Sequence, residues 1–375
     1  MKIGILTVPF NNNYGGCLQA FALMTVLKRL GHHPYMIMRR HNLYSYSLLA
    51  KAKYVFRSFL NTLKYKRFDI LIHPFEPYYD FTYAYKIQKF VSHYICPQTS
   101  YFYSWYKLEN KLRKHFDVLI VGSDQVWRSV YVPGVENYFF NFAKNWDASR
   151  IAYAASFGTT EPEYTEEEIK TCGKLLRLFD AVSVREQGAL SVFNKFNWNT
   201  DEVKVVLDPT LLLDAMAYET IMSYTDNGVP YLFAYVLDKT QDKDSAIHQV
   251  CDSHNLIVKN QYENDSLLSI EDWLGLIKNA NSVVTDSFHG MVFSIIFHVP
   301  FVVVVNKERG SDRFKSLLNM LQLEDRLAYS PSKICDIIER PIDWLSVDTL
   351  LQKYRKESVS FLKMNLNQSK PKKRK

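Results

Sequence analysis

Residues 281–306 read NSVVTDSFHGMVFSIIFHVPFVVVVN. A short apolar run at residues 282–285 ends in Asp-Ser, and a mostly apolar helical segment follows until Pro300. Five apolar residues at 301–305 then have the pattern of a fully buried parallel strand. This order of strand, turn, helix and strand is typical of a doubly wound α/β sheet. Its turn falls at the carboxyl end of a strand, where open α/β sheets bind their ligands.

His289 lies in the first turn of that predicted helix. Asp286 and Ser287 are favoured N-cap residues, so the backbone amides beside them are expected to point out of the helix start and attract an anion. Gly290 would let a ligand approach the backbone closely. A histidine beside an anion site can neutralise charge or deliver a proton. The alternative is that His289 only caps its helix or bonds a core carbonyl.

The length of 375 residues exceeds what one ordinary hydrophobic core supports, so two domains are expected. We place residues 1–210 in an amino-terminal Rossmann-like domain, 211–340 in a carboxyl-terminal one, and 341–375 in a last helix with a basic tail. No apolar run is long enough to span a membrane, and the first residues have too short an apolar run for a signal peptide. The five cysteines include no close pair. These features predict a cytoplasmic protein without a disulfide framework or a metal site.

The net charge of +7 lies mostly in the tail, because residues 370–375 (KPKKRK) hold five positive charges and leave +2 (7 − 5) for the rest. We therefore predict no nucleic-acid partner. Residues 39–68 contain eight Lys or Arg, seven Tyr or Phe, and no acidic residue. Such a segment is typical of contact with an anionic membrane or a lipid-linked phosphate, which predicts peripheral association with the inner face of the cytoplasmic membrane. Packing of these aromatic residues on the domain is the alternative.

The first predicted strand, at residues 2–8, leads through a glycine-containing loop to a helical pattern at 17–30. The loop contains Asn13, Tyr14 and Gly15, and its glycines suit a tight bend. It is neither a dinucleotide fingerprint nor a phosphate-binding P-loop. We expect these three residues to line the cleft, unless the turn has no role beyond bending the chain.

Two further predicted strands, at residues 117–122 and 181–184, also end in polar residues at the ligand edge of the sheet. Arg185 follows the second strand, where its guanidinium can hold a carboxylate or a phosphate, unless it only pairs with Glu186. The residues that follow the first strand, and that we expect in the cleft, are Ser123, Asp124, Gln125 and Trp127.

Six motifs occur in the order NNNYGGCLQAFAL, VGSDQVW, SVRE, VLDPTLLL, DSFHG and NKERGSDRF. Their order and spacing resemble the polysaccharide pyruvyl transferase family over most of the chain. The resemblance implies two Rossmann-like domains that face each other across a cleft, as in glycosyltransferases of the GT-B type. It implies phosphoenolpyruvate as co-substrate, no separate cofactor, and a hexose of a cell-surface polysaccharide precursor as acceptor. Whether that acceptor is lipid-linked stays open. The product would be a pyruvate ketal that bridges two sugar hydroxyls.

The resemblance also implies site residues. The family's active-site histidine, which we interpret as the general acid, falls on His289. Many members have Arg-Leu before this histidine, where this chain has Ser287 and Phe288. Arg309 or Arg313 could supply the missing charge. On the donor side we therefore place Arg185, Lys307, Arg309 and Ser287.

The residue that accepts a proton and two alternative functions stay open on the sequence alone. Asp124 or Asp286 could take the proton of the attacking hydroxyl, although either could merely cap a helix. A nucleotide-sugar glycosyltransferase of the GT-B fold is one alternative function. A non-catalytic glycan-binding relative is the other.

Overall fold

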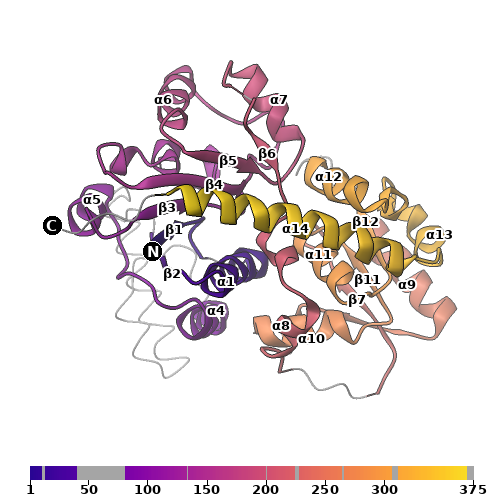
Figure 1. Ribbon diagram of the computed structural model, residues 1–375. Helices are drawn as coiled ribbons and strands as arrows, with labels where there is room; N and C mark the ends of the chain where they lie inside the picture. The colour runs from indigo at the N-terminus through magenta and orange to yellow at the C-terminus, as the bar shows by residue number, and fades with distance from the viewer. Residues whose placement is uncertain are drawn as a thin grey trace, which may run out of the picture.

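The computed structural model of the chain describes residues 1–10, 13–39, 81–132, 134–199, 201–223, 228–263, 266–305 and 311–369. Two parallel sheets of six and five strands, flanked by helices, form two Rossmann-like domains (Figure 1). This confirms the predicted α/β class. The basic aromatic segment, apart from Arg39, and the basic tail at 370–375 lie outside the described residues.

The first sheet has the strand order β2-β1-β3-β4-β5-β6 and every pairing in it is parallel. Its strands are β1 (Lys2–Leu6), β2 (His33–Met36), β3 (Val118–Val121), β4 (Ser149–Ala155), β5 (Ala181–Val184) and β6 (Lys204–Val205). The α-helices around it are α1 (Tyr14–Arg29), α4 (Phe81–Tyr94), α5 (Trp105–Leu112), α6 (Glu166–Leu176) and α7 (Gly188–Lys195). Short 3-10 helices follow β3 at η2 (Ser129–Tyr131), η3 (Val135–Phe139) and η4 (Asn141–Ala143).

Two helices of this domain begin where a side chain caps them. The helix predicted at 17–30 begins at Tyr14, because the side chain of Asn13 accepts a hydrogen bond from the amide of Gly16. Helix α6 begins at Glu166, because Thr165 and Glu168 form a reciprocal capping box. The first case brings the glycine loop into the start of α1.

The second sheet has the order β13-β12-β11-β7-β8 and is also parallel. Its strands are β7 (Tyr231–Tyr235), β8 (Ile257–Asn260), β11 (Ser282–Thr285), β12 (Phe301–Val304) and β13 (Leu327–Ala328), and a separate hairpin contains β9 (Tyr262–Glu263) and β10 (Ser266–Leu267). Its α-helices are α8 (Ala215–Glu219), α9 (Gln241–His254), α10 (Ile270–Lys278), α11 (Phe288–Ile296), α12 (Asp312–Leu321) and α13 (Ile334–Ile338), with 3-10 turns at η5 (Pro209–Leu212), η7 (Glu324–Arg326) and η8 (Pro331–Lys333).

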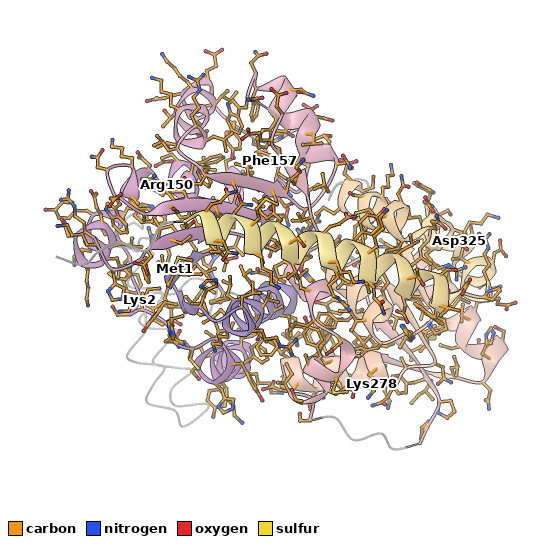
Figure 2. All side chains as sticks on the ribbon, viewed as in Figure 1. Met1, Lys2, Arg150, Phe157, Lys278 and Asp325 are labelled. Atoms are coloured by element: carbon orange, nitrogen blue, oxygen red, sulfur yellow. The ribbon has the colours of Figure 1, made fainter. Side chains whose placement is uncertain are left out.

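The carboxyl ends of the first sheet point toward the second domain. Figure 2 labels Arg150 and Phe157 near the two ends of β4, and the Phe157 end is the one nearer the second domain. The turn between β11 and α11 contacts the start of α1, as described below. Both ligand edges therefore meet at the junction of the domains.

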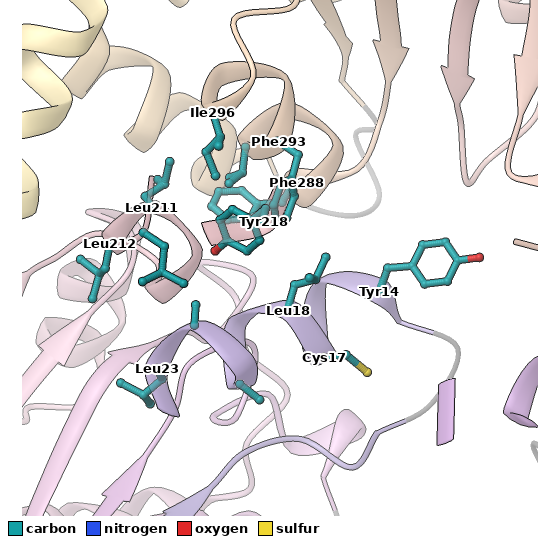
Figure 3. Close-up of a cluster of buried hydrophobic side chains, with 14 of the residues drawn as sticks. Tyr14, Cys17, Leu18, Leu23, Leu211, Leu212, Tyr218, Phe288, Phe293 and Ile296 are labelled. Carbon is teal, nitrogen blue, oxygen red and sulfur yellow. The ribbon is translucent and has the colours of Figure 1, made fainter. Parts of the chain in front are cut away.

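The junction has a continuous hydrophobic core. Figure 3 shows Leu18 of α1, Tyr218 of α8 and Phe293 of α11 within one cluster of buried side chains. The rings of Tyr218 and Phe293 lie 4.8 Å apart, edge to face. The cluster includes Ile3 of the first sheet and Val283 of the second, so the two sheets share packed residues.

The last helix, α14 (Trp344–Gln368), begins on the second domain and ends on the first (Figure 1). Arg355 Nε donates to the carbonyl of Leu211 at 2.8 Å, and Ser358 Oγ accepts from the amide of Leu207 at 3.0 Å. These bonds fix α14 across the connection between the sheets. In the described part of the chain, no helix is both long and apolar enough to cross a bilayer.

Candidate functional site

Arg185 and His289, predicted from separate halves of the chain, converge on one carboxylate. Arg185 follows β5, and its Nη1 donates to Oδ2 of Asp208 at 2.7 Å. His289 lies in the first turn of α11, and its Nε2 is 3.8 Å from Oδ1 of Asp208. The second distance is that of an ion pair and exceeds a hydrogen bond. All three side chains are buried.

Asp208 was not among the residues predicted for the site from the sequence. Its Oδ1 accepts from the amide and the hydroxyl of Thr210 at 3.0 and 2.6 Å, and its Oδ2 accepts from the hydroxyl of Ser123 at 3.2 Å. Burial opposes ionisation of this carboxyl, but the neighbouring His289, the charge of Arg185 and the hydroxyl of Thr210 outweigh it and hold the pKa of Asp208 well below its usual value. Asp208 is therefore an anion that holds Arg185 and faces His289. Its position just after β6, at the same edge of the sheet as Asp124, could have identified Asp208 from the sequence.

Asp124 is a second counter-ion for Arg185. Its Oδ1 is 3.5 Å from Arg185 Nη2, and its Oδ2 accepts from Nδ2 of Asn13 at 3.2 Å. Because Asn13 also caps α1, the glycine loop is connected through Asp124 to the arginine. The structure thus brings Asn13, Asp124 and Arg185 together.

Gly15 lies directly against the histidine. A Cβ atom at Gly15 would be 1.8 Å from Nδ1 of His289, closer than a Cβ atom approaches any other atom. The missing side chain therefore allows the starts of α1 and α11 to meet. The predicted cleft residue Gly15 thus lies beside the predicted acid.

Tyr14 and Trp127 lie in packed interiors, whereas we expected both to line the cleft. Tyr14 is 2% exposed and donates its hydroxyl to the carbonyl of Leu268 at 2.5 Å, so it ties α1 to the second domain. Trp127 is 0% exposed, donates its indole N–H to the carbonyl of Tyr138, and stacks on Phe139 at 4.8 Å. Their aromatic surface is used for packing.

The other predicted cleft residues support the site from behind or lie beside it. Ser123 is fully buried, and its amide donates to Oε1 of Gln19 at 2.9 Å. Gln125 packs against Gly158, where a Cβ atom would be 1.9 Å from its Oε1. Asp286 accepts from two backbone amides and from Lys243 Nζ at 2.9 Å, which makes it a structural carboxylate.

Three predicted donor-side residues remain. Ser287 precedes α11 without a side-chain capping bond, and its amide donates to the hydroxyl of Thr285 at 3.0 Å. Lys307 and Arg309 lie outside the described residues.

Phe288 occupies the position beside the histidine. Its ring lies edge to face with His289, with centroids 5.3 Å apart. The guanidinium carbon of Arg185 is 4.5 Å from the same ring, and that of Arg313 is 5.9 Å from it. These are cation–π distances. Phe288 is therefore the common neighbour of His289, Arg185 and Arg313.

Glu186 is the third carboxylate beside Arg185. Its Oε1 accepts from Ser156 Oγ at 2.8 Å and from the amide of Phe157 at 3.3 Å, while its Oε2 is 3.8 Å from Arg185 Nε. Burial raises the pKa of Glu186 above its usual value, more strongly than Arg185 and the Ser156 hydroxyl lower it. This carboxyl is thus held less firmly as an anion than Asp208.

Four polar atoms at this junction are buried without a hydrogen-bond partner within the described ranges. They are Arg185 Nε, Glu186 Oε2, His289 Nε2 and Arg313 Nε. Buried polar groups normally have partners, so a group of such atoms around one ring can bind a polar ligand. Within the described ranges, at this junction and outside it, there is no group of three or more His, Cys, Asp or Glu side chains that could hold a metal ion.

The geometry and the motifs agree with one family. The family model described as polysaccharide pyruvyl transferase matches residues 13–308. The chain belongs to the polysaccharide pyruvyl transferase family. This confirms the resemblance and places the chain among transferases of polysaccharide biosynthesis. No curated protein sequence matches the chain significantly.

Two solved structures with a similar fold contain UDP or UDP-GlcNAc. The co-structure of S. aureus MnaA with UDP has a TM-score of 0.56 at 11% identity and covers 98% of this chain and 97% of that one. UDP-GlcNAc 2-epimerase from Neisseria meningitidis, bound to UDP-GlcNAc, has a TM-score of 0.56 at 8% identity and covers 98% and 100%. At such identities the likeness extends to the fold alone, and it confirms the GT-B-like arrangement.

Proposed function

We propose that this chain transfers the pyruvyl group of phosphoenolpyruvate to a hexose of a cell-surface polysaccharide precursor and forms a pyruvate ketal. The observation that carries the proposal is the convergence of Arg185 and His289, from separate domains, on Asp208 in a member of this family. Phosphoenolpyruvate carries a carboxylate and a phosphate. A site with two cationic side chains beside a helix start is matched to it in charge.

In the proposed reaction His289, as imidazolium, protonates the methylene carbon of phosphoenolpyruvate. The neighbouring carbon becomes oxocarbenium-like, and one sugar hydroxyl adds to it and loses its proton. Inorganic phosphate then leaves, the second hydroxyl closes the ring at the same carbon, and its proton is released with the phosphate. The proton of the first hydroxyl restores the imidazolium, so the reaction balances without an oxidant or reductant.

The neighbours of His289 have supporting roles in this proposal. Asp208, held by Thr210 and Ser123, orients and stabilises the imidazolium as a positioning residue. Asp124 is the better candidate to take the proton of the first hydroxyl and pass it on to His289, since Asp286 is already bonded to Lys243 and two amides. Arg185 would hold the donor while Asp208 and Asp124 balance its charge.

The nature of the acceptor and its place in the cell belong to the same proposal. The basic aromatic composition of residues 39–68 supports a lipid-linked acceptor and a peripheral position at the inner face of the cytoplasmic membrane. Cosedimentation with liposomes that contain anionic lipid tests this, with neutral liposomes as the control. Equal recovery with both at low salt would count against it.

A nucleotide-sugar enzyme is the second candidate, since the similar folds named above were solved with UDP or UDP-GlcNAc. Two measurements decide between them. Phosphoenolpyruvate, and not UDP or UDP-GlcNAc, should raise the melting temperature, because a ligand that binds only the folded state stabilises it. Phosphate should then be released from phosphoenolpyruvate when candidate lipid-linked glycans are added. Stabilisation by UDP alone would favour the second candidate.

A further inference from the structure

Arg313 reaches the site from the second domain. It is the second residue of α12, whose start packs on the start of α7 in the first domain. The amide of Gln187 donates to Oγ of Ser316 at 3.2 Å, and a Cβ atom at Gly188 would be 3.3 Å from Cβ of Asp312. These contacts fix the first turn of α12 against the residues that follow Arg185.

The two arginines differ in their partners. Arg185 faces Asp208, Asp124 and Glu186 within 3.8 Å, so carboxylates surround its charge. Arg313 shares the ring of Phe288 with it, but its Nε is buried and has no hydrogen-bond partner in the described part of the chain. Arg313 as a whole is half-buried, and a cation that is partly removed from water is costly unless an anion pairs with it.

The charge balance around Arg313 favours an anionic partner. Burial, followed by the charge of Arg185, lowers the pKa of Arg313 to about 10, so it remains a cation near neutral pH. Glu186 is the carboxylate that counters this most, but burial disfavours ionisation of Glu186 itself. A ligand with a carboxylate or a phosphate would relieve both effects.

The residues next to the histidine supply no cation. The residue before Phe288 and His289 is Ser287, which is uncharged. Arg313 brings a guanidinium to the ring of Phe288 from another helix. Together with Arg185, it places a second guanidinium near the histidine.

We propose that Arg313 is a substrate-binding residue that holds the phosphate or the carboxylate of phosphoenolpyruvate beside His289. This inference rests on the proposed function, because it names the ligand. Pairing of Arg313 with Glu186 for stability alone is the competing explanation.

Calorimetric titration of phosphoenolpyruvate into the full chain tests the inference. Arg313→Gln should weaken binding about 10- to 100-fold, the range expected for the loss of a hydrogen bond to a charged group. Lys315→Gln is the matched control, since Lys315 is an exposed cation in the same turn of α12 and should leave binding unchanged. The double variant Ser287→Arg with Arg313→Gln should recover most of the affinity, which a purely structural role of Arg313 would not produce.

Two further ligands assign the group that Arg313 holds. If it binds the phosphate, Arg313→Gln should weaken competition by inorganic phosphate and leave competition by pyruvate unchanged. If it binds the carboxylate, the reverse should hold. Arg313→Lys keeps the charge without the planar fork and should lose less affinity, which covers the case in which Arg313→Gln folds poorly.

The outcomes separate the two proposals. If the unaltered chain binds phosphoenolpyruvate and the folded Arg313→Gln and Arg313→Lys variants bind it with equal affinity, this inference is overturned. The proposed function then stays intact. Failure of the unaltered chain to bind phosphoenolpyruvate overturns both. Weaker binding without recovery by Ser287→Arg overturns the claim that a guanidinium beside His289, and not the packing of Arg313, holds the donor.

Discussion

Gly15 and His289 lie in contact across the junction of the two domains. A Cβ atom on Gly15 would be 1.8 Å from Nδ1 of the imidazole and 2.2 Å from its Cγ. Each residue stands in the first turn of its helix, α1 or α11. Gly15 is therefore needed for close approach, and the contact links the motif near the amino terminus to the histidine motif.

Gly15→Ala should therefore abolish most of the turnover. A methyl group at this position must displace the imidazole or separate the starts of the two helices, so both activity and melting temperature should fall. Gly16→Ala is the control in the same turn, because its Cβ atom would be 3.2 Å from the nearest atom, a side-chain nitrogen of Asn13. Phosphate release and thermal unfolding of the two variants measure this. Normal activity of Gly15→Ala would show that the imidazole does not need its observed position.

His289→Gln should reduce phosphate release about 10²- to 10⁴-fold, the usual contribution of a general acid. Donor binding should weaken less, because Arg185 and the start of α11 remain. His298→Gln is a matched control, since His298 is a more exposed histidine just after α11 that pairs with Asp348 at 2.9 Å. Stopped-flow phosphate release and calorimetric titration separate the two effects. Turnover that survives in His289→Gln would refute the acid role.

Asp208→Asn should be both inactive and unstable. It removes the charge that faces His289 and the strongest ion pair of Arg185, and breaking a buried ion pair costs about 3–5 kcal/mol. Asp348→Asn changes an exposed carboxylate that also faces a histidine, and it should change the free energy of unfolding by less than about 1 kcal/mol. Urea unfolding of both variants provides the comparison. Equal stability losses would mean that Asp208 is not the anchor of the site.

The sequence predicted the order of strands and helices well because buried parallel strands such as β3 and β12 are continuous apolar runs. It also predicted that the residues after β3 and β5 would lie at one edge, since the carboxyl ends of parallel strands in a sheet share that edge. Only the family resemblance implied that the residues after β11, in the second sheet, would face them. Short elements such as β2 (His33–Met36) were missed, because a strand with His, Pro and Tyr has no clear apolar pattern.

The direction of individual side chains could not be predicted. Trp127 and Asp124 follow the same strand, yet one stacks in the core and the other contacts Arg185. The irregular backbone after β3 decides this, and Asp124 has a left-handed φ of 71°. The role of Asp208 depends on which acidic residue Arg185 and His289 both approach. These two residues are far apart in the sequence, so only the packed junction shows it.

The pH dependence of stability tests Glu186. Burial raises the pKa of this carboxyl above its ordinary value of 4.5, against the smaller opposing effects of Arg185 and Ser156. The native state therefore binds the proton more tightly than the unfolded chain, so the stabilisation is complete below pH 4.5 and is lost as the pH rises through the raised pKa. Glu186→Gln has no carboxyl to ionise, so it keeps its stability as the pH rises. The unfolding free energy of Glu186→Gln minus that of the unaltered chain should therefore increase with pH from about 4.5 toward neutrality. Urea unfolding across this range measures the difference, with Glu163→Gln, an exposed partner of Arg128, as the control that should show no trend. A difference that stays constant or falls with pH would mean that the cations around Glu186 outweigh its burial.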